Sequence, residues 1–324
     1  MEALQFSSYG GGVAGLKHVR VPIPEPKKDE VQIKVEATSL NPFDWKIQAG
    51  TLRPFLPSKF PYTPCTDVAG EVTKVGSSNS KGFKPGDKVV AMISPANGGG
   101  LAEYAAVKAN LTVIRPDTVS AADGASLATT AMTAYQALKT VGGLTTRPIQ
   151  NILITAASGG VGIMAVQLAK LLAPSSHVTV TCGARNFEFM RSLGADEVLD
   201  YKSPEGASLK SPSGKKYDLV VDAASGISWS TFASNMSAKS KVVYLTPNGS
   251  SFLTVVLRKI TFSSKQAAIL FTAQNDKDLE FLVRLVEEGK LKVKIDSKYP
   301  LTKAEDAWAK CMDGHATGKI IVEP

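Results

Sequence analysis

Two patterns of hydrophobic and polar positions divide the chain. Up to about residue 120, short apolar or alternating runs are separated by Gly- and Pro-rich turns such as KPGD (84–87). A period of two is typical of half-buried strands, so we predict strands over 31–40, 69–76 and 87–93. This part of the chain is therefore predicted to be β-rich.

From residue 122 onward the apolar positions change to helical spacing. The stretch 122–141 carries apolar and small residues at such intervals, which predicts helix. Strand-like and helical runs then alternate, an order typical of a parallel sheet with helices on both faces. The predicted strands are 151–156, 177–182, 196–201, 217–223 and 241–246, the predicted helices are 160–173 and 186–194, and the tail holds an amphipathic helix over 276–290 and a last strand over 318–324.

The sequence AASGGVG (156–162) stands between a predicted strand and a predicted helix. Gly159 and Gly160 are expected to allow a tight turn that a Cβ would resist, and Gly162 to let the helix pack closely. The helix N-terminus offers free N–H groups and a partial positive charge, which suit a phosphate. With four more alternating strands behind it, this variant fingerprint predicts a Rossmann dinucleotide site; a turn needed only for packing is the alternative.

The end of the second predicted strand favours NADPH as the cofactor. Sites that prefer NAD usually place Asp or Glu there to hold the ribose hydroxyls. Here the strand runs into TCGARN (181–186), which has no carboxylate, and Arg185 offers a fork of donors that fits a 2′-phosphate. The alternative for Arg185 is a solvated cation at the start of a helix.

Composition and charge limit the classes of partner. The 324 residues accommodate two domains, and 44% hydrophobic with 20% charged residues is ordinary for a globular protein. A net charge of +8 favours anionic partners, although a solvated lysine-rich surface is the simpler interpretation. Because no long basic run or basic patch interleaved with aromatics is present, a nucleic-acid partner is not expected.

Targeting signals and cysteines bear on the compartment. The chain lacks an apolar run of bilayer length, and its first residues lack the pattern of a cleavable signal or transit peptide. Any membrane association is therefore expected to be peripheral and electrostatic. The three cysteines, Cys65, Cys182 and Cys311, are widely spaced, which argues against a disulfide framework and fits a reducing compartment.

Motifs along the whole chain resemble the zinc-free quinone oxidoreductases of the medium-chain dehydrogenase/reductase superfamily, especially the plant chloroplast envelope homologues and the alkenal/enone oxidoreductases. The resemblance implies an α/β fold, with a GroES-like β-rich catalytic domain over 1–122 and 272–324 and an inserted Rossmann NADPH-binding domain over 123–271. It rests on NPFDWK (41–46), PYTPCTDVAGEV (61–72), FKPGDKV (83–89), MTAYQAL (132–138), AASGGVG (156–162), LGAD (193–196), VVDA (220–223) and GHATGK (314–319).

The comparison with zinc-dependent members implies that this chain uses no metal. Those members carry Gly-His-Glu where this chain reads Cys65-Thr66-Asp67, and their structural zinc lobe needs four clustered cysteines. The corresponding segment of this chain, 93–104, contains no cysteine. We therefore interpret all three cysteines as small apolar residues. The family has Gly at the position of Cys65, a difference expected to alter the substrate pocket.

Family likeness also implies the roles of individual residues. Asn41, Lys46 and Tyr62 match catalytic positions near the nicotinamide, where Lys46 contacts the cofactor or a developing enolate and the other two position a carbonyl. The alternatives are a turn residue for Asn41, a surface lysine and a half-buried core tyrosine. The implied cofactor-binding set is Lys46, Thr130, Thr133, Ser158, Gly159, Gly160, Val161, Gly162, Cys182, Gly183, Arg185, Tyr201, Leu245, Phe271, Thr272, His315 and Ala316.

The predicted activity is NADPH-dependent reduction of the C=C bond of α,β-unsaturated ketones, lipid-derived ones included, by hydride transfer without zinc. Reduction of quinones is one alternative, and a non-enzymatic NADPH-binding protein at a membrane surface or on RNA is another. The resemblance implies a monomer or homodimer at the chloroplast inner envelope, peripherally bound, with the cytoplasm as the alternative. The exact substrate, its stereochemistry and the proton donor stay open.

Overall fold

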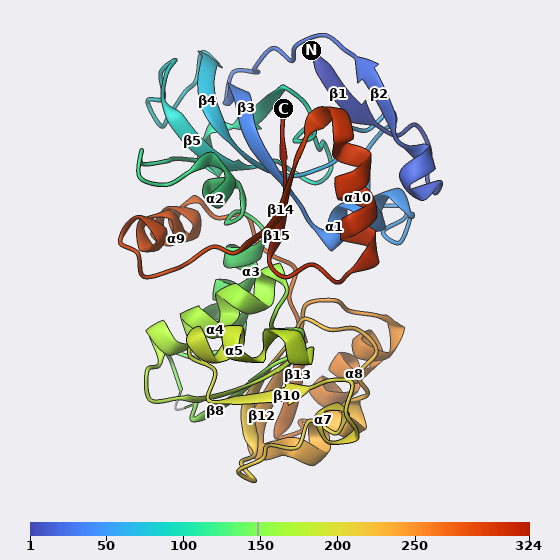
Figure 1. Ribbon diagram of the computed structural model, residues 1–324, viewed down its shortest axis with the longest axis vertical. Helices are drawn as coiled ribbons and strands as arrows, with labels where there is room; N and C mark the ends of the chain where they lie inside the picture. The colour runs from blue at the N-terminus through green and yellow to red at the C-terminus, as the bar shows by residue number, and fades with distance from the viewer. Residues whose placement is uncertain (148) are drawn as a thin grey trace. The chain divides into compact units, whose positions relative to one another are not determined.

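The chain forms two compact units. The computed structural model describes residues 1–147 and 149–324 (Figure 1). Unit 1 comprises Met1–Thr129 and Gln274–Pro324, and unit 2 comprises Thr130–Ala273. The sequence placed the domain boundaries at 122/123 and 271/272. No described helix is both long and apolar enough to cross a bilayer.

Unit 1 is built on a mostly antiparallel sheet, as the alternating pattern predicted. Its order is β14-β15-β3-β4-β5-β7, and β6 also pairs with β3. Among the strand pairs described for this sheet, β14 and β15 run parallel and the others antiparallel. The strands are β3 (Glu30–Leu40), β4 (Asp67–Val75), β5 (Lys88–Met92), β6 (Tyr104–Lys108), β7 (Thr112–Ile114), β14 (Ile295–Pro300) and β15 (Lys319–Glu323), with a separate pair β1 (Glu2–Gln5) and β2 (Lys17–Arg20).

The helices of unit 1 are short except for two near the C-terminus. They are η1 (Gly12–Gly15), α1 (Pro42–Gln48), η2 (Ala109–Leu111), α2 (Ala121–Ala125), α9 (Asp276–Glu287), η5 (Leu301–Lys303) and α10 (Ala304–Asp313). Helix α10 ends at Gly314, whose φ of 74° is the left-handed conformation that favours glycine at this position.

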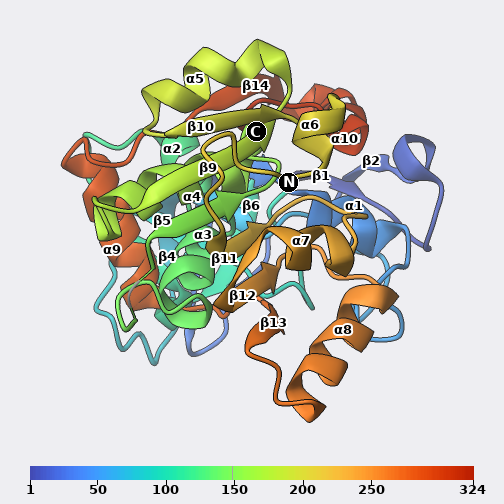
Figure 2. The ribbon, with the colours of Figure 1, turned by 90° about the horizontal axis from the view of Figure 1, so that it is seen from below.

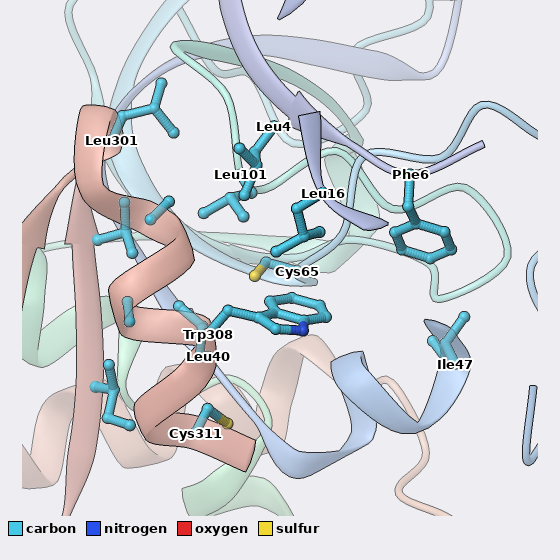
Figure 3. Close-up of a cluster of buried hydrophobic side chains, with 14 of the residues drawn as sticks. Leu4, Phe6, Leu16, Leu40, Ile47, Cys65, Leu101, Leu301, Trp308 and Cys311 are labelled. Atoms are coloured by element: carbon cyan, nitrogen blue, oxygen red, sulfur yellow. The ribbon is translucent and has the colours of Figure 1, made fainter. Parts of the chain in front are cut away.

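An apolar core joins α1, α10 and the β1–β2 pair. Figure 3 shows Trp308 of α10 surrounded by Leu4, Leu16, Leu40 and Ile47. Cys65 and Cys311 belong to the same cluster and carry no disulfide. Burial raises the pKa of Cys65 well above its usual range and that of Cys311 to about 12. Both cysteines act as small apolar residues here, as the sequence indicated.

Unit 2 is a doubly wound α/β sheet. Its six parallel strands have the order β10-β9-β8-β11-β12-β13, the 3-2-1-4-5-6 arrangement of dinucleotide-binding folds. The strands are β8 (Asn151–Ile154), β9 (His177–Cys182), β10 (Glu197–Asp200), β11 (Tyr217–Asp222), β12 (Met236–Tyr244) and β13 (Lys265–Ile269). The predicted α/β fold is confirmed, although β13 was missed in the sequence.

Helices cover the sheet because its central strands are apolar along their length and need cover on both faces. Leu153, Val220 and Val242 of the sheet pack with Phe232 of α7 and Val255 of α8. Figure 2 shows these elements from below. The helical segments are α3 (Thr130–Tyr135), the π-helical η3 (Gln136–Val141), α4 (Gly160–Leu172), η4 (Ala184–Asn186), α5 (Phe187–Ser192), α6 (Pro204–Ala207), α7 (Trp229–Asn235) and α8 (Gly249–Ile260).

The helical stretch predicted over 122–141 is interrupted. Helix α2 ends at Ala125, and α3 begins at Thr130, where unit 2 starts. Just before α3, the Thr129 hydroxyl donates to Asp67 Oδ1 of unit 1, at 2.6 Å. This contact ties residue 129 to the sheet of unit 1, which helical periodicity along the sequence does not reveal.

Candidate active site

The Gly-rich turn joins β8 to α4 in unit 2. Gly159 is the N-cap of α4, with φ −79° and ψ 171°, a conformation open to any residue. The positive φ of this turn, 49°, belongs instead to Ala156. The expectation that a Cβ would resist the turn at Gly159 and Gly160 gains no support here, because neither glycine has a positive φ and a Cβ on Gly159 would lie 3.4 Å from the Ala156 carbonyl oxygen.

Gly162 has the role predicted for it, which is close packing. A Cβ on Gly162 would lie 2.4 Å from Ala157 Cα, so a side chain there would push α4 away from the turn. The half-buried residues Ser158, Gly159, Gly160 and Val161 line the start of the helix. Free N–H groups at this thirteen-residue helix's start fit the pyrophosphate of a dinucleotide.

The ends of β9 and β10 carry an aromatic ring and cations. Arg185 is exposed on η4, directly after β9, and Tyr201 follows β10 with 46% of its surface exposed. The Lys202 Nζ lies 5.8 Å from the Tyr201 ring centroid. A Cβ on Gly183 would come within 3.8 Å of that ring. A cation beside an exposed aromatic ring after β10, and an exposed arginine after β9, are groups that fit an adenosine 2′-phosphate.

Cys182, the last residue of β9, contributes packing rather than a reactive thiol. Its side chain is buried, and burial raises its pKa to about 11. The thiolate is the nucleophilic form of cysteine, and a raised pKa disfavours it. Cys182 is therefore interpreted as a packing residue at the end of β9.

A cavity of about 140 Å³ lies at the carboxyl ends of β11 and β12, the edge where doubly wound sheets bind ligands. Asp222 lines it, and its Oδ1 accepts a 2.6 Å hydrogen bond from the Thr155 hydroxyl. Burial raises the Asp222 pKa to about 6. Leu245, which follows β12, donates its backbone N–H to the Asp222 carbonyl. Asp222 and Thr155 were missed in the sequence, where VVDA (220–223) was quoted only as part of a motif.

Two predicted cofactor residues bond to each other in unit 2. The Thr133 and Thr272 hydroxyl oxygens are 2.6 Å apart. Nearby, Gln136 exchanges two hydrogen bonds with the backbone of Ala273, each 2.9 Å long. These bonds hold the segment before Gln274 against α3 and η3. Thr130 is buried one turn earlier on α3, and Phe271 keeps 70% of its surface exposed.

A buried polar network occupies the start of α1 in unit 1. Lys319 donates to the Leu40 carbonyl at 2.9 Å and to Asn41 Oδ1 at 2.6 Å, and its Nζ lies 4.0 Å from Asp67 Oδ2. Asn41 Nδ2 donates to the same carboxylate oxygen at 2.8 Å. Burial lowers the pKa of Lys319. One signal for this network is present in the sequence, a lysine directly before the apolar run 320–322.

These contacts fix Asn41 as a structural residue of the helix start. It is the N-cap of α1, and its backbone N–H donates to Asp44 Oδ2 at 2.7 Å. Pro42 then suits the first helical position, because its missing N–H needs no partner there. Both Oδ1 and Nδ2 of the Asn41 side chain form hydrogen bonds within the fold. These contacts favour the role of a turn residue, which was one of the two roles considered from the sequence.

Lys46 is two residues further along α1 than Asp44 and has a different environment. It is half-buried, its Nζ lies 5.7 Å from the Trp45 ring centroid, and burial lowers its pKa. Among the ion pairs of residues 1–147 and 149–324, none includes Lys46. The ammonium is thus partly desolvated and is not neutralised by a carboxylate.

Tyr62 is placed in the core. Only 2% of its surface is exposed, its ring packs 5.3 Å from that of Phe6, and its hydroxyl donates to the Pro95 carbonyl at 2.8 Å. Burial raises its pKa above the ordinary value. These contacts favour the core role over carbonyl positioning. His315 and Ala316 follow α10 in unit 1; the first is exposed and the second packs against the Trp308 cluster.

The residues at 65–67 do not make a zinc site. Cys65 lies in the apolar cluster, and Asp67 accepts hydrogen bonds from Ser39, Asn41 and Thr129. No group of three or more His, Cys, Asp or Glu side chains able to hold a metal occurs in the part of the chain that the structure describes. The donor set needed for zinc is missing from this position.

Comparisons with known proteins agree with the fold of the two units. Residues 27–117 match the model of the alcohol dehydrogenase GroES-like domain, and residues 193–322 match that of zinc-binding dehydrogenases. The chain is 61% identical to the chloroplast envelope quinone oxidoreductase homolog of Arabidopsis thaliana, over all of this chain and 98% of the relative. It is 33% identical to the chloroplastic NADPH-dependent alkenal/one oxidoreductase of the same plant, over all of this chain and 80% of the relative.

A solved structure gives the same result for the fold. The quinone oxidoreductase from Coxiella burnetii is similar with a TM-score of 0.90 and 29% sequence identity, over all of this chain and 99% of that one. The parallel sheet in dinucleotide-binding order, the Gly-rich turn at its central strand and relatives that match the whole of this chain all agree. The chain is an NAD(P)H-binding oxidoreductase and belongs to the quinone oxidoreductases of the medium-chain dehydrogenase/reductase superfamily.

Proposed function

We propose that this oxidoreductase uses NADPH to reduce the C=C bond of α,β-unsaturated ketones, without zinc. The proposal rests on the environment of Lys46. Its ammonium is partly desolvated and has no carboxylate partner among the described ion pairs. Bound NADPH would supply a hydride to the β-carbon of the enone, and negative charge would then move to the carbonyl oxygen. Lys46 would donate a hydrogen bond to that enolate oxygen.

Conjugate reduction suits the residues near Lys46 better than reduction of a carbonyl to an alcohol. The latter gains most from a Lewis acid, and residues 65–67 do not form a metal donor set. An enolate needs only hydrogen-bond donors and a later proton. A relative named for alkenals and enones supports this substrate class, and its name supports NADPH, as do Arg185, Tyr201 and Lys202.

Reduction of quinones is the second candidate, favoured by the name of the relative that is 61% identical. NADPH oxidation should be followed with an enone, with its saturated ketone and with a benzoquinone. We expect the enone to turn over to the saturated ketone, the saturated ketone not to react, and chelator to have no effect. A higher kcat/KM for the quinone would replace the first proposal by the second.

We further propose that the protein associates peripherally with an anionic membrane of the chloroplast, in reach of lipid-derived enones. The names of its relatives place them in the chloroplast or its envelope. A net charge of +8 supports electrostatic attraction to such a surface. Fractionation of intact chloroplasts with and without added salt would test the location.

A further inference from the structure

Helix α8 of unit 2 has an apolar side that the protein leaves uncovered. Ser251 and Val255 face the unit, where Val255 packs beside the cluster around Phe232. Other apolar residues, spaced three and four apart, stay 45–67% exposed. We call these residues and the one after the helix's C-cap the α8 face: Phe252, Leu253, Val256, Leu257, Ile260 and Phe262. Figure 2 shows α8 beside the edge strand β13.

Phe262 is the most unusual member of the α8 face. It is 94% exposed, and its backbone has φ 48°, in the left-handed region. After a helix C-cap that conformation is usually adopted by Gly or Asn, since a Cβ is strained there. Neither burial within the chain nor backbone preference accounts for a phenylalanine. An outlier of this kind points to a role outside the folding of the unit.

The charge around the α8 face has one sign. Residues 249–265 contain Arg258, Lys259 and Lys265 and no Asp or Glu. Arg258 lies over the Trp229 ring at 4.9 Å, Lys265 donates to the Ala233 carbonyl, and Lys259 is exposed next to Ile260. A second copy of the chain would bring the same basic residues to a shared interface. A surface of anionic lipids instead complements both the apolar side chains and the lysine.

We propose that the α8 face is the surface through which this protein binds an anionic lipid bilayer. The exposed apolar side chains insert at the boundary between headgroups and acyl chains, and Lys259 lies among the anionic headgroups. The helix is formed before binding, since Asn248 and Ser251 make a capping box at its start. The inference rests on the proposed membrane association and adds to it the contact surface.

Phe262→Gly gives a test with two effects of opposite sign. Removing one inserted phenylalanine should lower binding to vesicles about tenfold. Glycine adopts the left-handed backbone conformation of position 262 without strain, so the melting temperature should stay equal or rise. The full-length protein would be sedimented with vesicles of phosphatidylcholine containing a third of phosphatidylglycerol, and with vesicles of phosphatidylcholine alone. Phe55→Ser, which changes an 81% exposed phenylalanine of unit 1, is the matched control and should bind like the wild type.

A second variant tests the charge. Lys259→Gln should weaken binding to the phosphatidylglycerol vesicles about fivefold and leave the weak binding to neutral vesicles unchanged. If the wild type binds vesicles and Phe262→Gly binds equally well, the α8 face is not the binding surface, while the proposed membrane association is retained. If the wild type binds neither vesicle, both proposals fail. Conversion of a wild-type oligomer to a monomer by Phe262→Gly, without vesicle binding by either protein, would assign the face to a second copy instead.

Discussion

Two lysines of unit 1 show how differently one residue type can be used. Lys319 is buried, donates to a carbonyl and an amide oxygen, and lies beside Asp67. Lys46, on the helix that begins at the same network, is half-buried and makes no such hydrogen bond with residues 1–147 or 149–324. The charge of Lys319 is already used in holding the fold together. No carboxylate pairs with Lys46 among the described ion pairs, which is why we propose a functional role for Lys46 and a structural one for Lys319.

The largest expected effect is on stability at Lys319. Replacing one partner of a buried charge network leaves the other charge uncompensated, so Lys319→Met should lower the free energy of unfolding by about 3–5 kcal/mol. Lys298→Met, which breaks an exposed ion pair with Glu323, is the control and should cost at most about 1 kcal/mol. Urea unfolding measures both. Equal losses in the two variants would show that the Asp67 network does not need its lysine.

Lys46 should show the reverse pattern, an effect on catalysis and little on stability. If its ammonium stabilises the enolate, Lys46→Ala should lower kcat for an enone by about 100- to 1,000-fold, the usual contribution of a preorganised donor. Lys46→Arg, which keeps a donor, should retain part of the rate. A variant that needs more NADPH but recovers normal kcat at saturation would make Lys46 a cofactor anchor only. Unchanged kinetics would remove it from the site.

A third cation, Arg185, extends the comparison to unit 2. It is exposed at the end of β9, where a 2′-phosphate would distinguish NADPH from NADH. Arg185→Ala should weaken NADPH binding about tenfold to a hundredfold, the loss of a charge-assisted hydrogen bond, and leave NADH unchanged. Arg191→Ala, an exposed arginine paired with Glu188, is the control. Calorimetric titration measures the affinity for each cofactor. An equal loss of affinity for NADH would assign Arg185 a role in folding.

The sequence was informative where periodicity and local motifs determine structure. Strand 177–182 was predicted with the bounds that the structure shows, and the packing role of Gly162 followed from its place in the turn. Strand β13 was missed because KQAAI has neither alternation nor a run of large apolar residues. A weak local pattern becomes a strand there only through pairing with β12.

The site itself was less visible because its polar contacts join residues far apart in the chain. Asn41 and Tyr62 matched catalytic positions, yet the hydrogen bonds of Asn41 to Asp67 and Lys319 span 26 and 278 residues. Helical spacing could not show that Thr129 leaves the helix to bond Asp67. Motifs point to candidate segments, and tertiary contacts then separate the residues that are bonded within the fold from those that remain candidates for the site.

The smallest expected effect concerns Asp44, which lies on α1 between the network and Lys46. Burial raises its pKa to about 7, with Asp67 adding to the shift, and its Oδ1 has no hydrogen-bond partner among the described residues. Because the folded pKa lies above the unfolded one, the folded state holds this proton more tightly. Stability contributed by the neutral acid is therefore lost as the pH rises toward and through 7.

Asp44→Asn keeps the acceptor for the Asn41 N–H and cannot ionise. Its stability relative to the wild type should rise by about 1 kcal/mol between pH 6 and pH 8, measured by urea unfolding. Parallel pH profiles for the two proteins would mean that Asp44 stays ionised in the fold, and that the lysine network extends further along α1 than its hydrogen bonds indicate.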